Sequence, residues 1–260
     1  MMKITFLGVE GYPQGNRSTI SILLEYQDYR ILLDCGGSII GQLDRHGLSA
    51  CDVDAVFVSH LHADHSSGLP LLLFGNLMER FEKRVSGPGN IAILGNQANI
   101  EPVVSYCKAA YPALFGVDSL IRIDLVNIGV FTPLETISGI VLESAPISHT
   151  IQGQSLALSI GGYRICYTSD TRRTEMLDNL AKGSDLLICN VLGCDDNLAE
   201  SFGFLSAAGA ANLAHDIGAS KLAMIHLPSV LSMSDATKVA SDLFSGDIVT
   251  PVNGESFLIS

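Results

Sequence analysis

The stretch Ser59–His65 reads S-H-L-H-A-D-H and places four side chains of the metal-ligand type within six positions. In an extended chain, side chains two positions apart point to the same side, so we expect His60 and His62 to face one centre. A turn after them would direct Asp64 and His65 toward a second centre nearby. The spacing therefore predicts a metal site built on this loop.

The donor types in this stretch narrow the choice of metal. Imidazole and carboxylate without a thiolate suit zinc, manganese or iron better than a structural cysteine site. The preceding apolar run, Val53–Ser59, predicts a buried strand that ends in the ligand-rich loop. The alternative is a solvated histidine loop without a metal. The density of ligand-type residues favours the metal site.

Length and composition limit the possible classes of protein. The chain has 260 residues and no linker-like segment, which predicts one domain over residues 1–260. Hydrophobic residues make up 47% and charged residues 16%, a composition typical of a layered, well-buried globular protein. The net charge of -12, with only 15 Lys and Arg, argues against a broad nucleic-acid interface. A small anionic substrate remains compatible with this charge.

The cysteines and the apolar segments indicate the compartment. Six cysteines occur without CxxC spacing, and Cys166 and Cys189 lie in apolar runs, so we interpret the cysteines as reduced core residues. The apolar run at Met1–Val9 is too short for a signal peptide, and no stretch approaches membrane-spanning length. We therefore predict a cytoplasmic protein without a membrane segment.

Three further ligand-type residues, His149, Asp170 and His226, also follow predicted strands. A lone histidine at a strand end is more often a hydrogen-bonded polar residue than a ligand. Asp170 has an alternative role as the N-cap of a helix at Glu175–Lys182, which is compatible with its being a ligand as well. Asp34 is predicted either to accept a hydrogen bond from a ligand histidine or to cap a turn. Because loops at one sheet edge converge, the recurrence of these residues favours a single site.

The order H-x-H-x-D-H, a lone His, an Asp after T-S-D and a late His resembles the metallo-β-lactamase-fold hydrolases. Phe6-Leu7-Gly8, the loop Gly11–Arg17 and Asp34-Cys35-Gly36 resemble the ribonuclease Z-like branch, which includes small-molecule phosphodiesterases. The resemblance spans essentially the whole chain. It implies an α/β (α+β) fold, a four-layer αββα sandwich of two mixed β-sheets flanked by helices, and a homodimer.

The resemblance also implies two divalent metal ions, zinc or else manganese or iron. Their seven ligands would be divided between two positions with one bridge: His60, His62 and His149 at the first, Asp64, His65 and His226 at the second, and Asp170 between them. Asp64 would in addition be catalytic, because it could orient the attacking water or accept its proton. The β-lactamases of this fold have a cysteine in place of Asp170, which argues against β-lactam hydrolysis.

Two departures from the ribonuclease Z pattern bear on the substrate. Phe204 stands where that family usually has a histidine, and Asn190 stands where an acidic residue is common. Both changes remove groups that could protonate a leaving oxygen or orient such a group. The sequence also contains no basic, Gly/Pro-rich insertion resembling a tRNA-binding arm, so tRNA processing is disfavoured.

Three functions remain open from the sequence. The first is hydrolysis of a small phosphodiester, with cyclic or activated diesters favoured because the usual acid is missing. The second is hydrolysis of carboxylic esters or thioesters at the same centre. The third is a non-hydrolytic metal-binding accessory role in a biosynthetic pathway, which Phe204 and Asn190 keep open.

Overall fold

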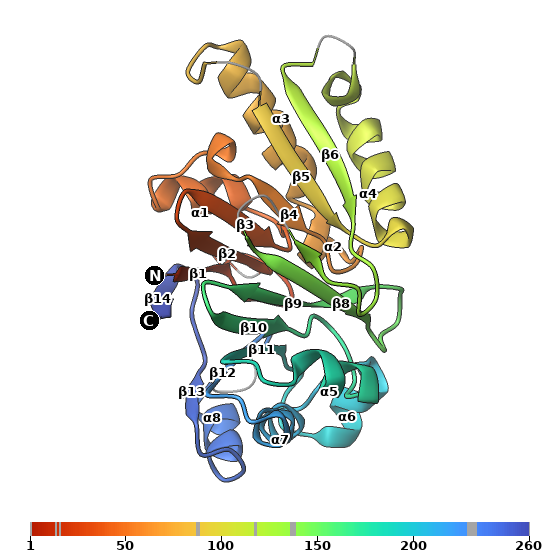
Figure 1. Ribbon diagram of the computed structural model, residues 1–260. Helices are drawn as coiled ribbons and strands as arrows, with labels where there is room; N and C mark the ends of the chain where they lie inside the picture. Colours follow the sequence, from red (N-terminus) through yellow and green to blue (C-terminus); the bar gives the residue numbers. More distant parts are fainter. Residues whose placement is uncertain are drawn as a thin grey trace. The chain divides into compact units, whose positions relative to one another are not determined.

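The computed structural model describes residues 2–13, 15, 17–86, 89–116, 119–135, 139–227 and 233–259 (Figure 1). The chain divides into two compact units, Met1–Asn127 with Val252–Ser260 and Ile128–Pro251. Each unit contains one mixed seven-stranded sheet, so the α/β class with two mixed sheets is confirmed. The single domain over residues 1–260 stays a prediction. Residues 14 and 16 of the predicted loop Gly11–Arg17 lie outside the described residues.

The sheet of the first unit has the strand order β14-β1-β2-β3-β4-β5-β6. Strands β14, β1, β2 and β3 pair antiparallel, whereas β3 to β6 pair parallel. The carboxyl ends of β3 and β4 therefore lie at the same edge. The elements of this unit are β1 (Met2–Gly8), β2 (Ser21–Tyr26), β3 (Tyr29–Leu33), α1 (Ile39–Arg45), η1 (Ala50–Asp52), β4 (Ala55–Phe57), α2 (Ala63–Ser66), α3 (Leu69–Phe81), β5 (Gly89–Gly95), α4 (Gln97–Ala110), η2 (Pro112–Phe115), β6 (Ile121–Asn127) and β14 (Glu255–Ile259).

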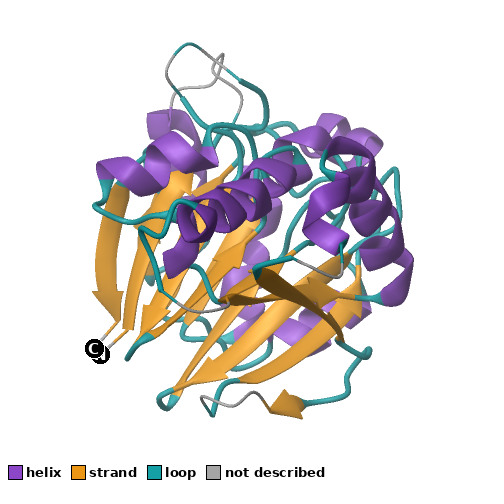
Figure 2. Ribbon diagram, turned by 90° about the horizontal axis from the view of Figure 1, so that it is seen from above, coloured by secondary structure: helices purple, strands orange, loops and turns teal. Residues whose placement is uncertain are grey.

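Apolar side chains at helical spacing pack α1, α3 and α4 against this sheet. Leu43 of α1, Leu72 of α3 and Val103 of α4 are fully buried in one cluster with Leu32 and Val56 of the strands. Figure 2 shows the purple helices laid along the orange strands. Burial of each such side chain stabilises the fold by about 1.5–3 kcal/mol relative to an exposed one. This packing fixes the strand ends that carry the polar loops.

The sheet of the second unit has the order β13-β12-β11-β10-β9-β8-β7. Strands β10 to β13 pair parallel, and β7 to β10 pair antiparallel. Because β8 and β10 are both antiparallel to β9, the strands β8, β10, β11 and β12 run in the same direction. The elements of this unit are β7 (Leu134–Glu135), β8 (Val141–Pro146), β9 (Gln154–Ile160), β10 (Tyr163–Tyr167), α5 (Glu175–Ala181), β11 (Leu186–Asn190), α6 (Asp196–Phe202), α7 (Ala207–Ile217), β12 (Lys221–Ile225), α8 (Met233–Ser241) and β13 (Asp247–Val249).

Small side chains allow the helices of the second unit to pack closely. Ala210 and Ala214 of α7 and Ala236 of α8 are buried in a cluster with Leu187 and Met224 of the sheet.

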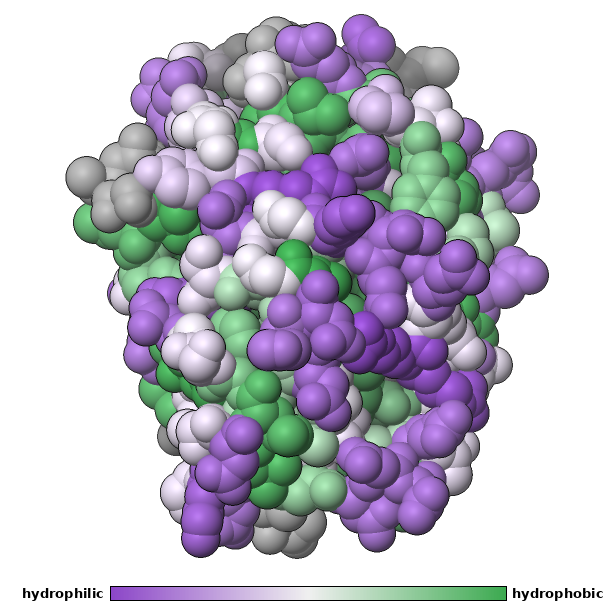
Figure 3. Space-filling model, turned by 60° about the horizontal axis from the view of Figure 1, so that its bottom comes forward, coloured by the Kyte–Doolittle hydropathy of each residue, from purple (hydrophilic) through white to green (hydrophobic). Residues whose placement is uncertain are grey.

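On the face in Figure 3, hydrophilic side chains lie between the hydrophobic ones. None of the helices in the described part of the chain combines the length and the apolarity needed to cross a bilayer.

The strand before the metal-ligand motif is shorter than predicted. The sequence predicts a strand over Val53–Ser59, but the ladder covers only Ala55–Phe57, because Val53 ends the turn η1. At the other end, the amide of Ser59 donates to the Asp34 carboxylate (2.7 Å) instead of to a neighbouring strand. The polar loop thus begins where backbone pairing is replaced by a side-chain acceptor.

Candidate metal centre

In the first unit the structure brings His60, His62, Asp64 and His65 together after β4. His60 Nε2 lies 3.0 Å from His62 Nδ1, and the rings of His60 and His65 have centroids 4.2 Å apart. His65 Nε2 lies 3.4 Å from Asp64 Oδ2. The short helix α2 (Ala63–Ser66) forms the predicted turn, and it carries both Asp64 and His65. The four donors of the motif therefore form one cluster.

Asp34 directly follows β3 and orients the side chains of this cluster through hydrogen bonds. Its carboxylate is fully buried, accepts from the backbone and hydroxyl of Ser59, and lies 2.7 Å from His65 Nδ1. Ser59 Oγ in turn lies 3.0 Å from His60 Nδ1. With Nδ1 so occupied, each imidazole presents Nε2 as the donor for a metal. The predicted contact of Asp34 with a candidate ligand histidine is confirmed.

Gly36, two residues after Asp34, allows the backbone that follows β3 to approach the ligand loop. A Cβ at Gly36 would lie 2.4 Å from the carbonyl oxygen of Asp64 and 2.3 Å from Thr19 Oγ1. The neighbouring amide of Cys35 donates to the carbonyl of His65 (2.7 Å). The segment Asp34-Cys35-Gly36 is therefore shaped by its contact with the ligand loop.

Replacing Asp34 by Asn should weaken metal binding by about 10- to 100-fold, because the neutral amide no longer matches the donors that face it. The lost acceptor should also lower the free energy of unfolding by about 1–3 kcal/mol. Chelator competition and thermal unfolding measure the two effects. The matched control is Asp54→Asn, since Asp54 also accepts a backbone hydrogen bond, from Arg30 (2.7 Å), but away from the histidines. Equal metal affinity in both variants would contradict this role of Asp34.

In the second unit the structure brings His149, Asp170 and His226 together. They follow β8, β10 and β12, whose carboxyl ends share one edge of the sheet. Asp170 Oδ2 lies 3.7 Å from His149 Nε2 and also 3.7 Å from His226 Nε2. Asp170 is almost fully buried. A single carboxylate thus faces two imidazoles at equal distances.

Hydrogen bonds fix the orientation of these side chains too. His149 Nδ1 lies 3.0 Å from the carbonyl oxygen of Gly203, and Asp170 Oδ1 accepts from Asn190 Nδ2 (2.7 Å). The N-cap of α5 is Thr174, whose side chain accepts from the amide of Leu177, so the alternative role of Asp170 as that cap is wrong. The Oδ2 atom of Asp170 therefore stays beside His149 and His226, an arrangement suited to a metal ligand.

Sequence reasoning missed the contacts of Phe204 and the helix α6 before it. The Phe204 ring lies against both histidines, with centroids 5.0 Å from His149 and 4.9 Å from His226. Helix α6 carries recognisable end signals, because Asp195 caps it and Gly203 ends it at a φ of 81°. Those signals could have predicted the helix. The packing of Phe204 on two distant histidines could not be predicted from spacing.

Strained backbone occurs at both clusters. The non-glycine residues Asp34, Ser169 and His226 have φ values of 56°, 56° and 65°, in the left-handed region. Such conformations cost about 1–3 kcal/mol each and persist where surrounding contacts hold them. Their position beside candidate ligands is typical of functional sites.

The donor sets fit a divalent ion. Two ligand atoms bound to one tetrahedral zinc at about 2.0–2.1 Å lie about 3.3 Å from each other. The donor separations within the two clusters, 3.0, 3.4, 3.7 and 3.7 Å, are close to that value. Imidazole and carboxylate are also the donor types that zinc, manganese and iron accept. Each cluster can therefore supply ligands to divalent metal.

The cysteines near these strands are not donors. All six are free thiols, as predicted, but only four are buried as core residues, since Cys51 and Cys194 are partly exposed. Burial raises the pKa of Cys166 to about 12, and burial raises the pKa of Cys189 well above its ordinary value. Because only the thiolate binds metal strongly, these side chains stay neutral core residues.

Sequence comparisons relate the chain to known proteins. Residues 2–93 match the family described as Anti-Pycsar protein Apyc1. "Probable metallo-hydrolase YhfI" of Bacillus subtilis is 27% identical over 252 residues, which cover 95% of this chain and 96% of the relative. A ribonuclease Z of Natronomonas pharaonis is 27% identical over 302 residues, which cover 98% and 97% of the two chains.

Solved structures share the fold. The metallo-beta-lactamase fold protein YhfI from Bacillus subtilis has a TM-score of 0.83 at 24% identity, covering 98% of both chains. A diphosphatase from the PhnP family has a TM-score of 0.74 at 15% identity, covering 100% of this chain and 98% of that one. The Zn(2+)-bound PqqB from Methylobacterium extorquens has a TM-score of 0.74 at 15% identity, covering all of both chains. The metallo-β-lactamase fold implied by the sequence motif is therefore confirmed.

Proposed function

We propose that this chain, which belongs to the ribonuclease Z-like branch of the metallo-β-lactamase-fold superfamily and is a metal-dependent hydrolase, cleaves a small phosphodiester at a centre of two metal ions. One observation carries the proposal: Asp170 Oδ2 lies 3.7 Å from the Nε2 atoms of both His149 and His226. A carboxylate placed equally between two imidazoles suits a ligand shared by two ions. The relatives named as a metallo-hydrolase and a ribonuclease Z support the hydrolytic chemistry.

Seven residues would hold the ions. We assign one position to His60, His62 and His149, the other to Asp64, His65 and His226, and the bridge to Asp170. Zinc is the proposed metal, since a structural neighbour is zinc-bound. Divalent ions there would supply Lewis-acid stabilisation of the developing charge and lower the pKa of the attacking water. Asp64 would orient that water and accept its proton, because its carboxylate is partly exposed beside His65.

The absence of a proton donor at positions 190 and 204 limits the class of phosphodiester that the site would cleave. Phe204 and Asn190 have no proton to give at neutral pH, yet they occupy the space beside His149 and Asp170. A leaving oxygen would therefore depart without protonation by either side chain. Substrates with a stable leaving group, or cyclic diesters whose ring opens to release strain, suit such a site. The net charge of -12 supports a small substrate rather than a long nucleic acid. The homodimer and the cytoplasmic location remain predictions.

A non-hydrolytic accessory role is the second candidate, because the same phenyl ring covers the candidate ligands His149 and His226. An ester or thioester hydrolase is the third. One experiment distinguishes the three. The protein is reconstituted in turn with zinc, manganese and iron(II), and hydrolysis of bis(p-nitrophenyl) phosphate is compared with that of p-nitrophenyl acetate.

We expect metal-dependent cleavage of the phosphodiester that chelator abolishes and added metal restores. Cleavage of the acetate alone would favour the esterase. A metal-loaded protein that is silent on both substrates would overturn the proposed hydrolysis and favour the accessory role.

A further inference from the structure

The side chain of Arg172 bonds to backbone carbonyl groups rather than to a carboxylate. Its Nε donates to the carbonyl oxygen of Glu200 (2.6 Å) and its Nη1 to that of Ser148 (3.4 Å). These carbonyl groups are neutral, and no ion pair to Arg172 occurs among the described residues. Carboxylate partners do occur at other arginines, namely Arg17, Arg30, Arg84, Arg122, Arg164 and Arg173.

The two backbone bonds leave part of the guanidinium available. A guanidinium has five N–H donors in a planar fork, and the carbonyl groups of Ser148 and Glu200 engage two of them. The remaining donors keep a fixed direction because the other two are held. Such a preorganised fork matches a phosphate group and loses little entropy on binding it.

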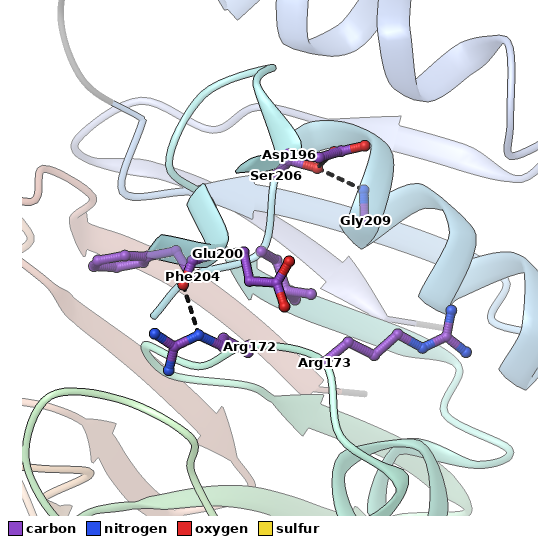
Figure 4. A pocket seen from close by; sticks show the side chains of 8 residues that line it. Arg172, Arg173, Asp196, Glu200, Phe204, Ser206 and Gly209 are labelled. Carbon is purple, nitrogen blue, oxygen red and sulfur yellow. Dashed lines mark hydrogen bonds between the residues drawn. The ribbon is translucent and has the colours of Figure 1, made fainter. Parts of the chain in front are cut away.

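A cavity of about 190 Å³ in the second unit gives Arg172 access to a ligand. Phe204 lines this cavity, and the same ring packs against His149 and His226. Figure 4 shows the Arg172 guanidinium and the Phe204 ring extending to the same side, whereas Arg173 extends away from them. Arg173 is occupied by Asp178 and Asp216. The cavity therefore places one cation without a carboxylate partner beside the Phe204 ring, which itself contacts two candidate ligands.

The acidic side chains of the cavity do not neutralise Arg172. The Asp196 carboxylate accepts from the hydroxyl of Ser206, at the N-cap of α7. Glu200 contributes its main-chain carbonyl to Arg172, and no bond from its carboxylate to Arg172 occurs in the described residues. A phosphate entering beside Arg172 would meet a held guanidinium and the apolar ring of Phe204, with Asp196 and Glu200 in the same lining.

We propose that Arg172 binds a second phosphate group of the substrate, separate from the diester that is cleaved, while Phe204 forms the apolar wall between the two. This inference rests on the proposed function and deepens it. It assigns the enzyme to phosphodiesters that carry a further phosphate, and it makes Arg172 the residue that selects them.

The test uses two chromogenic substrates with the same leaving group. One is the p-nitrophenyl ester of thymidine 5′-phosphate, and the other carries an additional 3′-phosphate. We expect the wild-type protein to favour the second by roughly 10- to 100-fold in kcat/KM, through KM, as a charge-assisted contact provides. Arg172→Gln should bring this ratio close to one, and Arg172→Lys should restore part of it. Arg173→Gln is the matched control and should keep the wild-type ratio.

A purely structural role of Arg172 predicts a different result. If Arg172 only ties the chain at Ser148 to α6, then Arg172→Gln would lower activity on both substrates equally and leave the ratio unchanged. That outcome, or a wild-type ratio near one, would overturn the inference.

Calorimetry separates this inference from the proposed function. Thymidine 3′,5′-bisphosphate and thymidine 5′-phosphate are titrated into the wild-type protein and the Arg172→Gln variant. Tighter binding of the bisphosphate by the wild type alone would support the subsite even if neither ester is cleaved. Equal affinities would reject the subsite even if both esters are cleaved.

Discussion

Replacing Asp64 by Ala is expected to lower kcat for phosphodiester hydrolysis by about 10²- to 10⁴-fold, the range that general-base catalysis supplies. Asp64 Oδ2 lies 3.4 Å from His65 Nε2, and its side chain keeps 18% of its surface exposed. It thus combines contact with a candidate ligand and access to water. Removing it takes away both a proposed metal donor and the proposed proton acceptor. The measurement is the steady-state rate on bis(p-nitrophenyl) phosphate in metal-saturating buffer.

The control for Asp64→Ala is Asp28→Ala, because Asp28 is exposed in the turn between β2 and β3. The control should retain wild-type kcat. Thermal unfolding of both variants checks that each is folded. An Asp64→Ala protein with wild-type kcat would remove Asp64 from the mechanism.

Replacing His149 or His226 by Ala is expected to remove about one of two bound ions per chain in each case, because the two histidines are assigned to different metals. Both imidazoles lie 3.7 Å from the same Asp170 oxygen. The double variant should lose both ions. Metal content after dialysis, measured by elemental analysis, gives the result directly. The control is His215→Ala, since His215 lies exposed on α7.

Unchanged metal content in both single variants would contradict the assignment of the ligands. Loss of metal in only one of them would limit the centre to a single ion. Loss in the His215 control as well would indicate unfolding rather than loss of a ligand.

The polar strand ends could be predicted because they depend on local sequence and on one rule of topology. Apolar runs identify strands, and strands that run in the same direction end at the same sheet edge. This reasoning brings His149, Asp170 and His226 to one edge of the second sheet, as the structure has them. The role of Asp34 was one of two open alternatives, and only its 2.7 Å contact with His65 decided between them.

Contacts across long sequence separations could not be predicted. The bond between His149 and the carbonyl of Gly203 joins residues 54 positions apart, and the neighbouring Phe204 ring lies edge-on to the same imidazole. Strand limits also escaped prediction, because Val53 ends the turn η1 and the amide of Ser59 donates to Asp34 instead of to a neighbouring strand. In each case tertiary contacts override local preference.

The most direct test of the proposed centre is anomalous X-ray diffraction from crystals of the zinc-reconstituted protein. The account predicts two anomalous peaks about 3.5–4 Å apart, with an oxygen of Asp170 bound to each. His60, His62 and His149 should bind one ion, and Asp64, His65 and His226 the other. A single peak, or two peaks without Asp170 as a ligand, would contradict the two-metal centre.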